Sequence, residues 1–289
     1  MLANRFRSLI IPMVIWNLAM IAVIAAAYAL GFKWYFRAHF DGYNALDWAN
    51  QVFSVTQRPA NAPLGYLRDL FVCIALAPVL IASLRAAATL TLVAITVLVF
   101  TDSVVLRFLL WPDILLYFSL GIALSLRGYD PAQLERYAIV FVPAGLAAMA
   151  ATVLAQREQV LHGASLPHLM TVTSLALACT LWWLAGRLKD TQLGRRIATW
   201  EPYCFTVFCS HVIVMTVLWA PWKLFVGDYY SPLYPLFFLA APILTFPAAW
   251  LILEILRHAP RWIARAFTGG RGLQPLAPAF AGASTKPAE

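Results

Sequence analysis

The sequence predicts an all-α protein, a polytopic transmembrane helix bundle that crosses a lipid bilayer about eight times. Hydrophobic residues make up 62% of the 289 residues and charged residues only 12%, about half of the roughly 25% that is usual in soluble domains. Apolar runs of about 20 residues, the length needed to cross the hydrocarbon core, recur along the chain. Because so few polar residues cannot cover a water-facing surface, lipid must contact most of the protein surface.

The apolar runs predict the spans individually. They cover residues 9–30, 66–84, 88–106, 108–126, 137–155, 169–186, 203–220 and 235–256. Only Arg107 separates the third span from the fourth, and Trp111-Pro112-Asp113 would let the fourth begin later. The first run is about 22 residues long and exceeds the core of a signal peptide, so we expect a retained helix.

Basic residues predict the orientation. With the N-terminus in the cytoplasm and strict alternation, fourteen Lys and Arg residues lie in inside segments and seven in outside segments. This bias predicts that both termini are cytoplasmic. It also accounts for the net charge of +8, and because no nucleic-acid-binding motif is present, we expect no nucleic-acid partner.

Two segments differ from the spans. Residues 31–65 form a long external loop rich in aromatic and amide side chains, among them Trp34, Tyr35 and Trp48. Residues 268–289 are rich in Gly, Pro and Ala and are predicted to form a disordered tail. Residues 1–267 are therefore expected to form a single membrane-embedded domain.

Ionisable residues inside predicted spans are candidates for function because burying them in lipid is costly. Five of them stand out, namely Asp69, Asp102, Asp113, His211 and Glu254. A neutral imidazole such as that of His211 can take a proton from a hydroxyl during acyl transfer. The alternative for His211 is a helix-packing residue bonded to a neighbouring helix, and the alternative for Asp113, which follows Pro112, is a helix cap.

Two basic sites also allow two interpretations. Arg5 and Arg7 precede the first span, where they either anchor the topology or clamp a phosphate-bearing donor. Arg68 and Asp69 open the second span and either bind substrate or form an interfacial ion pair. The four cysteines lie in apolar segments without metal-ligand spacing, so we expect no metal site and no bound cofactor.

Four segments, in order, resemble the acyltransferase 3 family. Residues 5–16 resemble the basic, Leu-rich entry to the family's third helix, and residues 63–71 resemble its Leu-Trp-Phe-Leu-Arg-Asp-Leu segment. Residues 116–122 are similar to its Phe-Gly-Leu-Gly helix, and residues 205–211 are similar to a late helix that ends in His.

This resemblance implies a function. Family members are bacterial inner-membrane O-acyltransferases of about ten helices that move acetyl or succinyl-type groups from acyl-CoA to hydroxyls of an envelope glycan or glycolipid. If the chain acts in this way, we expect Arg5 and Arg7 to bind the donor, Arg68 and Asp69 to bind the substrate, and His211 to lie between donor and acceptor as the catalytic base or orienting residue.

The departures from the family pattern keep alternatives open. The chain begins at what resembles the third helix, so that eight spans equal ten minus two. The His of the family's first helix, which is the family's proposed catalytic residue, therefore has no counterpart. Ser8 stands where a second Arg is expected, and Gly65 stands where Trp is usual. The alternatives are a truncated or inactive member, a non-catalytic membrane partner of the same fold, and a small-solute transporter with Asp69, Asp102 and His211 along its path.

Overall fold

The computed structural model describes residues 2–31, 40, 42–101, 103–129, 136–157, 165–228 and 231–273. Within these ranges all regular structure is helical. The elements are α1 (Leu2–Ala29), α2 (Ala45–Phe53), η2 (Ala62–Leu64), α3 (Gly65–Phe100), η3 (Val104–Leu106), α4 (Asp113–Leu126), α5 (Ala138–Arg157), α6 (Ser165–Leu188), α7 (Gln192–Ala198), α8 (Glu201–Phe225), α9 (Tyr234–His258) and α10 (Arg261–Thr268). Asp102 and the aromatic residues Trp34 and Tyr35 lie outside the described ranges.

The helices confirm the predicted all-α membrane fold. In the described part of the chain, six helices are long and apolar enough to cross a membrane, namely α1, α3, α5, α6, α8 and α9, and α4 is a shorter apolar helix. Many large apolar side chains point outward, such as Ile139 at 83% exposure and Phe225 at 80%, as expected where lipid is the solvent. The number of eight spans and the cytoplasmic location of both termini stay predictions.

Helix α3 contains two of the predicted spans. Ala87 has non-helical backbone angles (φ −153°, ψ 70°) and breaks the helix between the ranges predicted as 66–84 and 88–106. The second part ends at Phe100 rather than at residue 106, and α4 begins at Asp113 rather than at residue 108. A connection with the 3-10 turn η3 fills the interval, so the two helices are separated by more than Arg107 alone.

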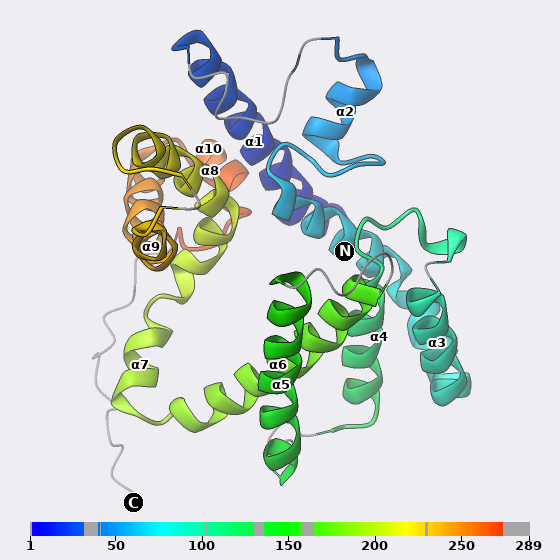
Figure 1. Ribbon diagram of the computed structural model, residues 1–289. Coiled ribbons are helices and arrows are strands. Elements are labelled where there is room, and N and C mark those ends of the chain that lie inside the picture. The colour runs from blue at the N-terminus through cyan, green and yellow to red at the C-terminus, as the bar shows by residue number, and fades with distance from the viewer. Residues whose placement is uncertain are drawn as a thin grey trace, which may run out of the picture.

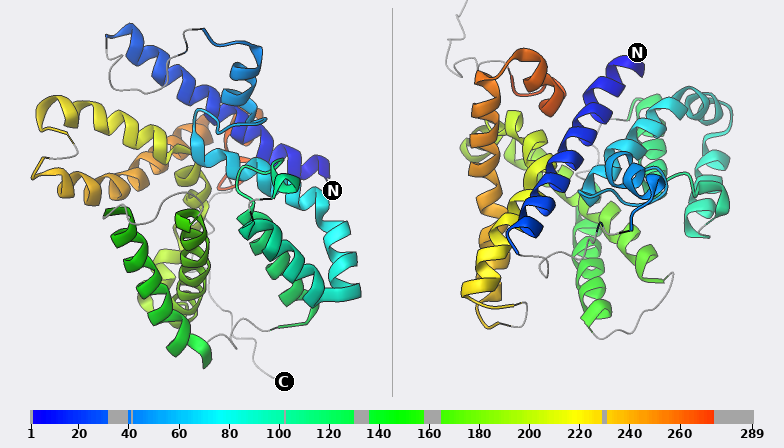
Figure 2. Two further views of the ribbon diagram at one scale, coloured as in Figure 1. Left: turned by 45° about the vertical axis from the view of Figure 1, so that its right-hand side comes forward. Right: turned by 90° about the horizontal axis from the view of Figure 1, so that it is seen from above.

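The helices form two neighbouring groups, visible in Figure 1 and from other sides in Figure 2. Helix α1 contacts α2, α3, α8 and α10, and α8 pairs with α9. On the other side α4 packs against α3, and α5 pairs with α6. The Tyr117 hydroxyl of α4 donates to the carbonyl of Thr171 in α6 (2.8 Å), and α7 joins α6 to α8 (Figure 1).

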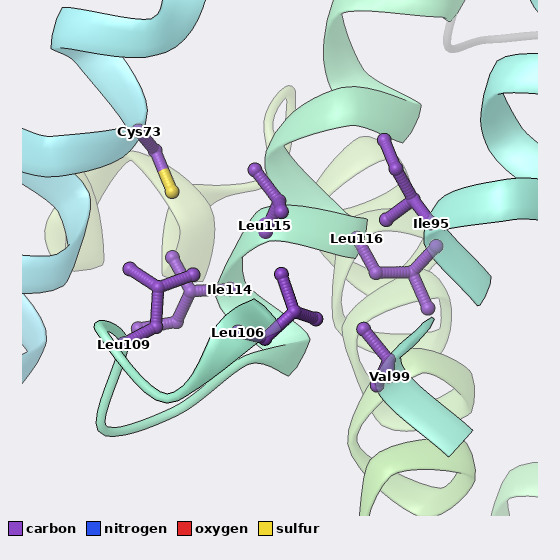
Figure 3. Packing of buried hydrophobic residues seen from close by; sticks show 8 residues of the cluster. All are labelled: Cys73, Ile95, Val99, Leu106, Leu109, Ile114, Leu115 and Leu116. Atoms are coloured by element: carbon purple, nitrogen blue, oxygen red, sulfur yellow. The ribbon is translucent and has the colours of Figure 1, made fainter. Parts of the chain in front are cut away.

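Two apolar clusters hold these groups together. One lies between α3, the 101–112 connection and α4 and includes Cys73, Val99, Leu109 and Leu116, as Figure 3 shows. The other lies between α1, α3 and α8. It consists of Leu9, Met13, Trp16, Leu64, Leu67 and Cys209. Helix α3 contributes to both clusters and therefore joins the two groups.

The chain after α10 folds back onto α1. Arg271 donates a hydrogen bond to the Ser8 carbonyl (2.9 Å), and its guanidinium lies 4.2 Å from the centre of the Phe205 ring. The Gly272 carbonyl accepts a hydrogen bond from Arg257. Residues 269–273 of the predicted tail are thus in contact with the bundle, and residues 274–289 lie outside the described ranges.

Candidate functional site

The segment between α2 and α3 folds into the helix bundle. Asn17, in the middle of α1, is fully buried. Its amide nitrogen donates to the Val52 carbonyl (2.9 Å), and its side-chain oxygen accepts the Asn61 backbone N–H (3.1 Å). The Asn61 side chain in turn donates to the carbonyl of Cys209 in α8 (2.8 Å). Part of the predicted external loop therefore reaches the middle of α1 and α8.

Polar side chains supply the hydrogen bonds that this irregular segment needs. Backbone without helix or sheet pairing is tolerated at membrane depth only where it is buried in protein with its polar groups satisfied. The buried Asn50 side-chain oxygen accepts the backbone N–H groups of Thr56 (2.7 Å) and Gln57 (3.2 Å). Asn44 caps the start of α2, with Asp47 completing a capping box. Asn44 and Asn50, two of the amide side chains of the predicted loop, thus bond to the backbone of this segment.

Arg68 and Asp69 form a buried ion pair that fixes two loops. The Asp69 carboxylate is fully buried, and its Oδ1 lies 2.6 Å from the Arg68 guanidinium. Its Oδ2 accepts the backbone N–H groups of Leu110 and Trp111, both at 2.8 Å. Arg68 also donates to the Val55 carbonyl (3.0 Å). Both oxygens of Asp69 are engaged, so the geometry gives this pair a structural task, and the predicted role in substrate binding stays a prediction.

The position of Trp111 explains why a glycine fits at residue 65. A Cβ atom on Gly65 would lie 2.5 Å from the ring atom Cζ3 of Trp111, closer than atoms pack. Trp111 therefore occupies the space beside Gly65.

His211 lies half-buried in the middle of α8. Its Nδ1 lies 2.7 Å from the Phe208 carbonyl oxygen and 3.3 Å from that of Val207. Carbonyl oxygens only accept hydrogen bonds, so these contacts place a proton on Nδ1, the tautomer in which the lone pair is on Nε2. Within the described residues, His211 makes no hydrogen bond to a neighbouring helix, which is the alternative that the sequence left open.

A basic cavity of about 720 Å³ lies between the start of α1 and α10. Arg7, Arg261 and Arg265 line it together with Trp262, and none of its lining residues is acidic. Within the described chain these three guanidinium groups have no ion-pair partner. Arg5 lies nearby, close enough for its charge to lower the pKa of Arg271, which burial lowers first. The residues predicted to bind a donor therefore lie in or beside a cavity.

A second cavity, of about 470 Å³, lies between the 110–113 segment, the end of α3 and the start of α6. Its lining includes Arg58, Trp111, Asp113, His168 and Ser174. The two cavities share no residue, and His211 is not among the residues lining either of them. The described residues contain no group of three or more His, Cys, Asp or Glu side chains arranged for a metal ion.

Sequence reasoning did not single out several of these cavity residues for function. In the sequence, Arg261 and Arg265 contribute only to the positive charge that predicts topology, although two Arg residues four positions apart share one face of a helix. Arg58 and His168 lie 110 positions apart (168 − 58) in the printed sequence, so no local pattern connects them.

An apolar helix bundle with an irregular, hydrogen-bonded segment inside it and a basic cavity at one end defines an integral membrane protein. The acyltransferase-domain family, acyltransferase 3, matches residues 1–254, so this chain belongs to that family. It is also similar to the succinoglycan biosynthesis protein ExoH of Rhizobium meliloti (strain 1021), with 26% identity over 277 residues that cover 93% of this chain and 72% of that protein. No solved structure matches the chain.

Proposed function

We propose that this protein is a membrane O-acyltransferase of a bacterial inner membrane that moves an acetyl or succinyl-type group from acyl-CoA to a hydroxyl of an envelope carbohydrate. Membership of the family and the similarity to a succinoglycan biosynthesis protein support this proposal. The structural observation that carries it is the basic cavity formed by Arg7, Arg261 and Arg265 at the end predicted to face the cytoplasm.

This cavity has the chemistry that the phosphates of coenzyme A require. Guanidinium groups bind phosphate through two parallel hydrogen bonds, and here three of them line one cavity without an acidic residue. Trp262 is 73% exposed and offers a ring face on which a nucleobase can stack. The cavity thus extends the predicted donor site at Arg5 and Arg7 by two arginines from α10.

His211 is the proposed base. The acceptor hydroxyl oxygen attacks the thioester carbonyl carbon, the C–O bond forms and the C–S bond breaks. Nε2 of His211 takes the hydroxyl proton and passes it to the departing thiolate, so that coenzyme A leaves as the thiol. The bond from Nδ1–H to Phe208 fixes the ring in the tautomer that leaves Nε2 able to accept a proton.

Acyl transfer from labelled acetyl-CoA or succinyl-CoA to envelope glycan, measured in membranes, tests this proposal. We expect His211→Ala to lower the rate by about 10²-fold or more, the usual contribution of a general base. The matched control is His258→Ala, because His258 is exposed at the end of α9. Unchanged incorporation in His211→Ala would remove that residue from the mechanism.

The donor site has its own test. Arg7→Gln and Arg265→Gln are expected to raise KM for acyl-CoA about tenfold each, the loss of roughly one charge-assisted hydrogen bond, while Arg127→Gln at the end of α4 leaves KM unchanged. Absence of transfer by the unaltered protein would favour a non-catalytic membrane partner. No structural observation favours a transporter, because Asp69 is buried and bonded through both oxygens.

A further inference from the structure

The second cavity brings together polar groups from three separate parts of the chain. Arg58 comes from the segment between α2 and α3, Trp111 and Asp113 from the start of α4, and His168 and Ser174 from α6. Its volume of about 470 Å³ lies within the roughly 300–1,000 Å³ of small-molecule sites. All these segments lie at the end of the bundle that is predicted to face away from the cytoplasm.

The walls of this cavity are held in place by bonds already described. Asp69 accepts the backbone N–H groups of Leu110 and Trp111, and Asn50 fixes the turn just before Arg58 through Thr56 and Gln57. The Tyr117 hydroxyl joins α4 to α6. The cavity is therefore bordered by anchored segments, which lowers the entropy cost of binding a ligand.

Arg58 is the cation of this cavity. Its guanidinium lies 5.5 Å from the centre of the Trp111 ring. No carboxylate of the described residues forms an ion pair with Arg58, and this includes Asp113 in the same lining. The cation–π contact orients the guanidinium but does not neutralise it. His168, whose ring lies 5.1 Å from that of Phe100, adds an imidazole to the same lining.

The remaining lining groups suit hydroxyls. Asp113 stands beside the Tyr117 hydroxyl, and a carboxylate accepts hydrogen bonds from hydroxyl donors. Ser174 and Thr171 add hydroxyl groups to the lining, and the indole of Trp111 offers an apolar surface. A hydroxyl-rich ring with one negatively charged substituent complements this combination of carboxylate, hydroxyls, indole and guanidinium.

We propose that this cavity binds the acceptor and selects a sugar that carries an anionic group, with Arg58 as the residue that recognises the anion. The anion is either a carboxylate of an acidic sugar or a phosphate ester on the sugar. This inference rests on the proposed function, because only an acyltransferase has an acceptor. The binding of an anionic sugar itself does not require that acyl transfer occurs.

Equilibrium binding to the purified full-length protein in detergent micelles, measured by calorimetry, tests the proposal with three probes. These are a disaccharide containing a uronic acid, the same disaccharide with its carboxyl reduced to an alcohol, and a hexose 1-phosphate. We expect at least one anionic probe to bind about tenfold or more tightly than the neutral disaccharide, the effect of one charge-assisted hydrogen bond.

The variants assign the effect to Arg58. Arg58→Gln is expected to remove the preference for the anionic probe, and Arg58→Lys to retain part of it because the charge is kept. Arg107→Gln is the matched control, since Arg107 is exposed in the neighbouring connection and lines neither cavity. Preference for the uronic acid identifies a carboxylate, and preference for the hexose phosphate identifies a phosphate.

Equal affinity of all three probes, or an unchanged preference in Arg58→Gln, would overturn this proposal. A thermal melt of each variant shows that it is folded, and Arg58 is exposed, so its replacement leaves the fold intact. Acyl transfer to a neutral glycan without anion preference would contradict this inference alone. Anion-selective binding without any acyl transfer would contradict the proposed function and leave this inference standing.

Discussion

Four buried side chains provide hydrogen bonds inside the bundle that water provides to loops at a protein surface. They are Asn17, Asn50, Asn61 and Asp69. Each is at most 1% exposed. Asn61 donates to the Cys209 carbonyl in α8, and Asn17, Asn50 and Asp69 accept backbone N–H groups that lie outside the helices. Leaving such a backbone group unpaired costs about 1–3 kcal/mol. These side chains therefore allow the segment between α2 and α3 to pack inside the helix bundle.

Asp69 provides a direct test at this scale. Asp69→Ala removes the partner of Arg68 and leaves the N–H groups of Leu110 and Trp111 unpaired, so we expect a loss of about 3–5 kcal/mol in stability. Asp69→Asn keeps an oxygen that can accept from both N–H groups and should lose less. Thermal melts in detergent measure both, with Asp190→Ala in an exposed turn as control. Equal melting temperatures for Asp69→Ala and the unaltered protein would contradict the structural role.

Gly65 tests the packing beside it. Because a Cβ atom there would meet the Trp111 ring at 2.5 Å, Gly65→Ala is expected to cost about 1–3 kcal/mol through overpacking. Gly121→Ala is the control, since nothing lies within 4 Å of a Cβ atom at that position. The comparison is again a melt in detergent, and a destabilisation of the same size in both variants would show that the ring is not the cause.

Among the elements, α10 has the clearest separate task. It lies beyond the part of the chain matched by the family, yet it is fixed to α1. Trp16 donates to the Phe267 carbonyl (2.9 Å), and the two rings meet edge to face at 5.5 Å. This attachment holds Arg261 and Arg265 beside Arg7. Helix α8, in contrast, carries His211 and receives the hydrogen bond from Asn61.

Weakening the attachment of α10 to α1 should therefore change the KM for the acyl donor more than it changes kcat. Trp16→Phe removes the hydrogen bond to Phe267 while keeping an aromatic ring, and we expect KM for acyl-CoA to rise about threefold to tenfold with kcat little changed. Trp182→Phe is the matched control, because Trp182 is 57% exposed on α6. Steady-state transfer kinetics provide the measurement. A fall in kcat with an unchanged KM would show that α10 does not serve the donor site.

In the whole molecule, each of the two cavities is lined by segments for which the alternating topology predicts the same side of the membrane. The starts of α1 and α10, both predicted to face inside, meet around one cavity. Segments predicted to face outside, near residues 58, 111 and 168, meet around the other. The segments that line each cavity are thus predicted to lie on one side of the membrane, where they can contact one another without crossing it.

Labelling of introduced cysteines decides which end faces the cytoplasm. We expect Gln57→Cys to react with a membrane-impermeant maleimide in intact cells and Asp190→Cys to react only after the cells are opened, because positive charges favour the inside. Both positions are exposed, and the unaltered chain with its four cysteines measures the background. The reverse pattern would invert the topology and place the basic cavity outside.

The sequence by itself determined the all-α membrane fold, the approximate positions of most spans and the family, because each depends on the local run of apolar residues or on short ordered motifs. It also led to Arg7, which lines a cavity, and to Asp69, although not to the task that the structure gives Asp69. Only the tertiary structure decided that α4 begins at Asp113 instead of residue 108, since the N–H groups of Leu110 and Trp111 bond to Asp69, about 40 positions earlier. It alone brought Arg7 to Arg261 and Arg58 to His168. A membrane span is recognisable from the hydrophobicity of consecutive residues, whereas a cavity depends on which distant segments pack together.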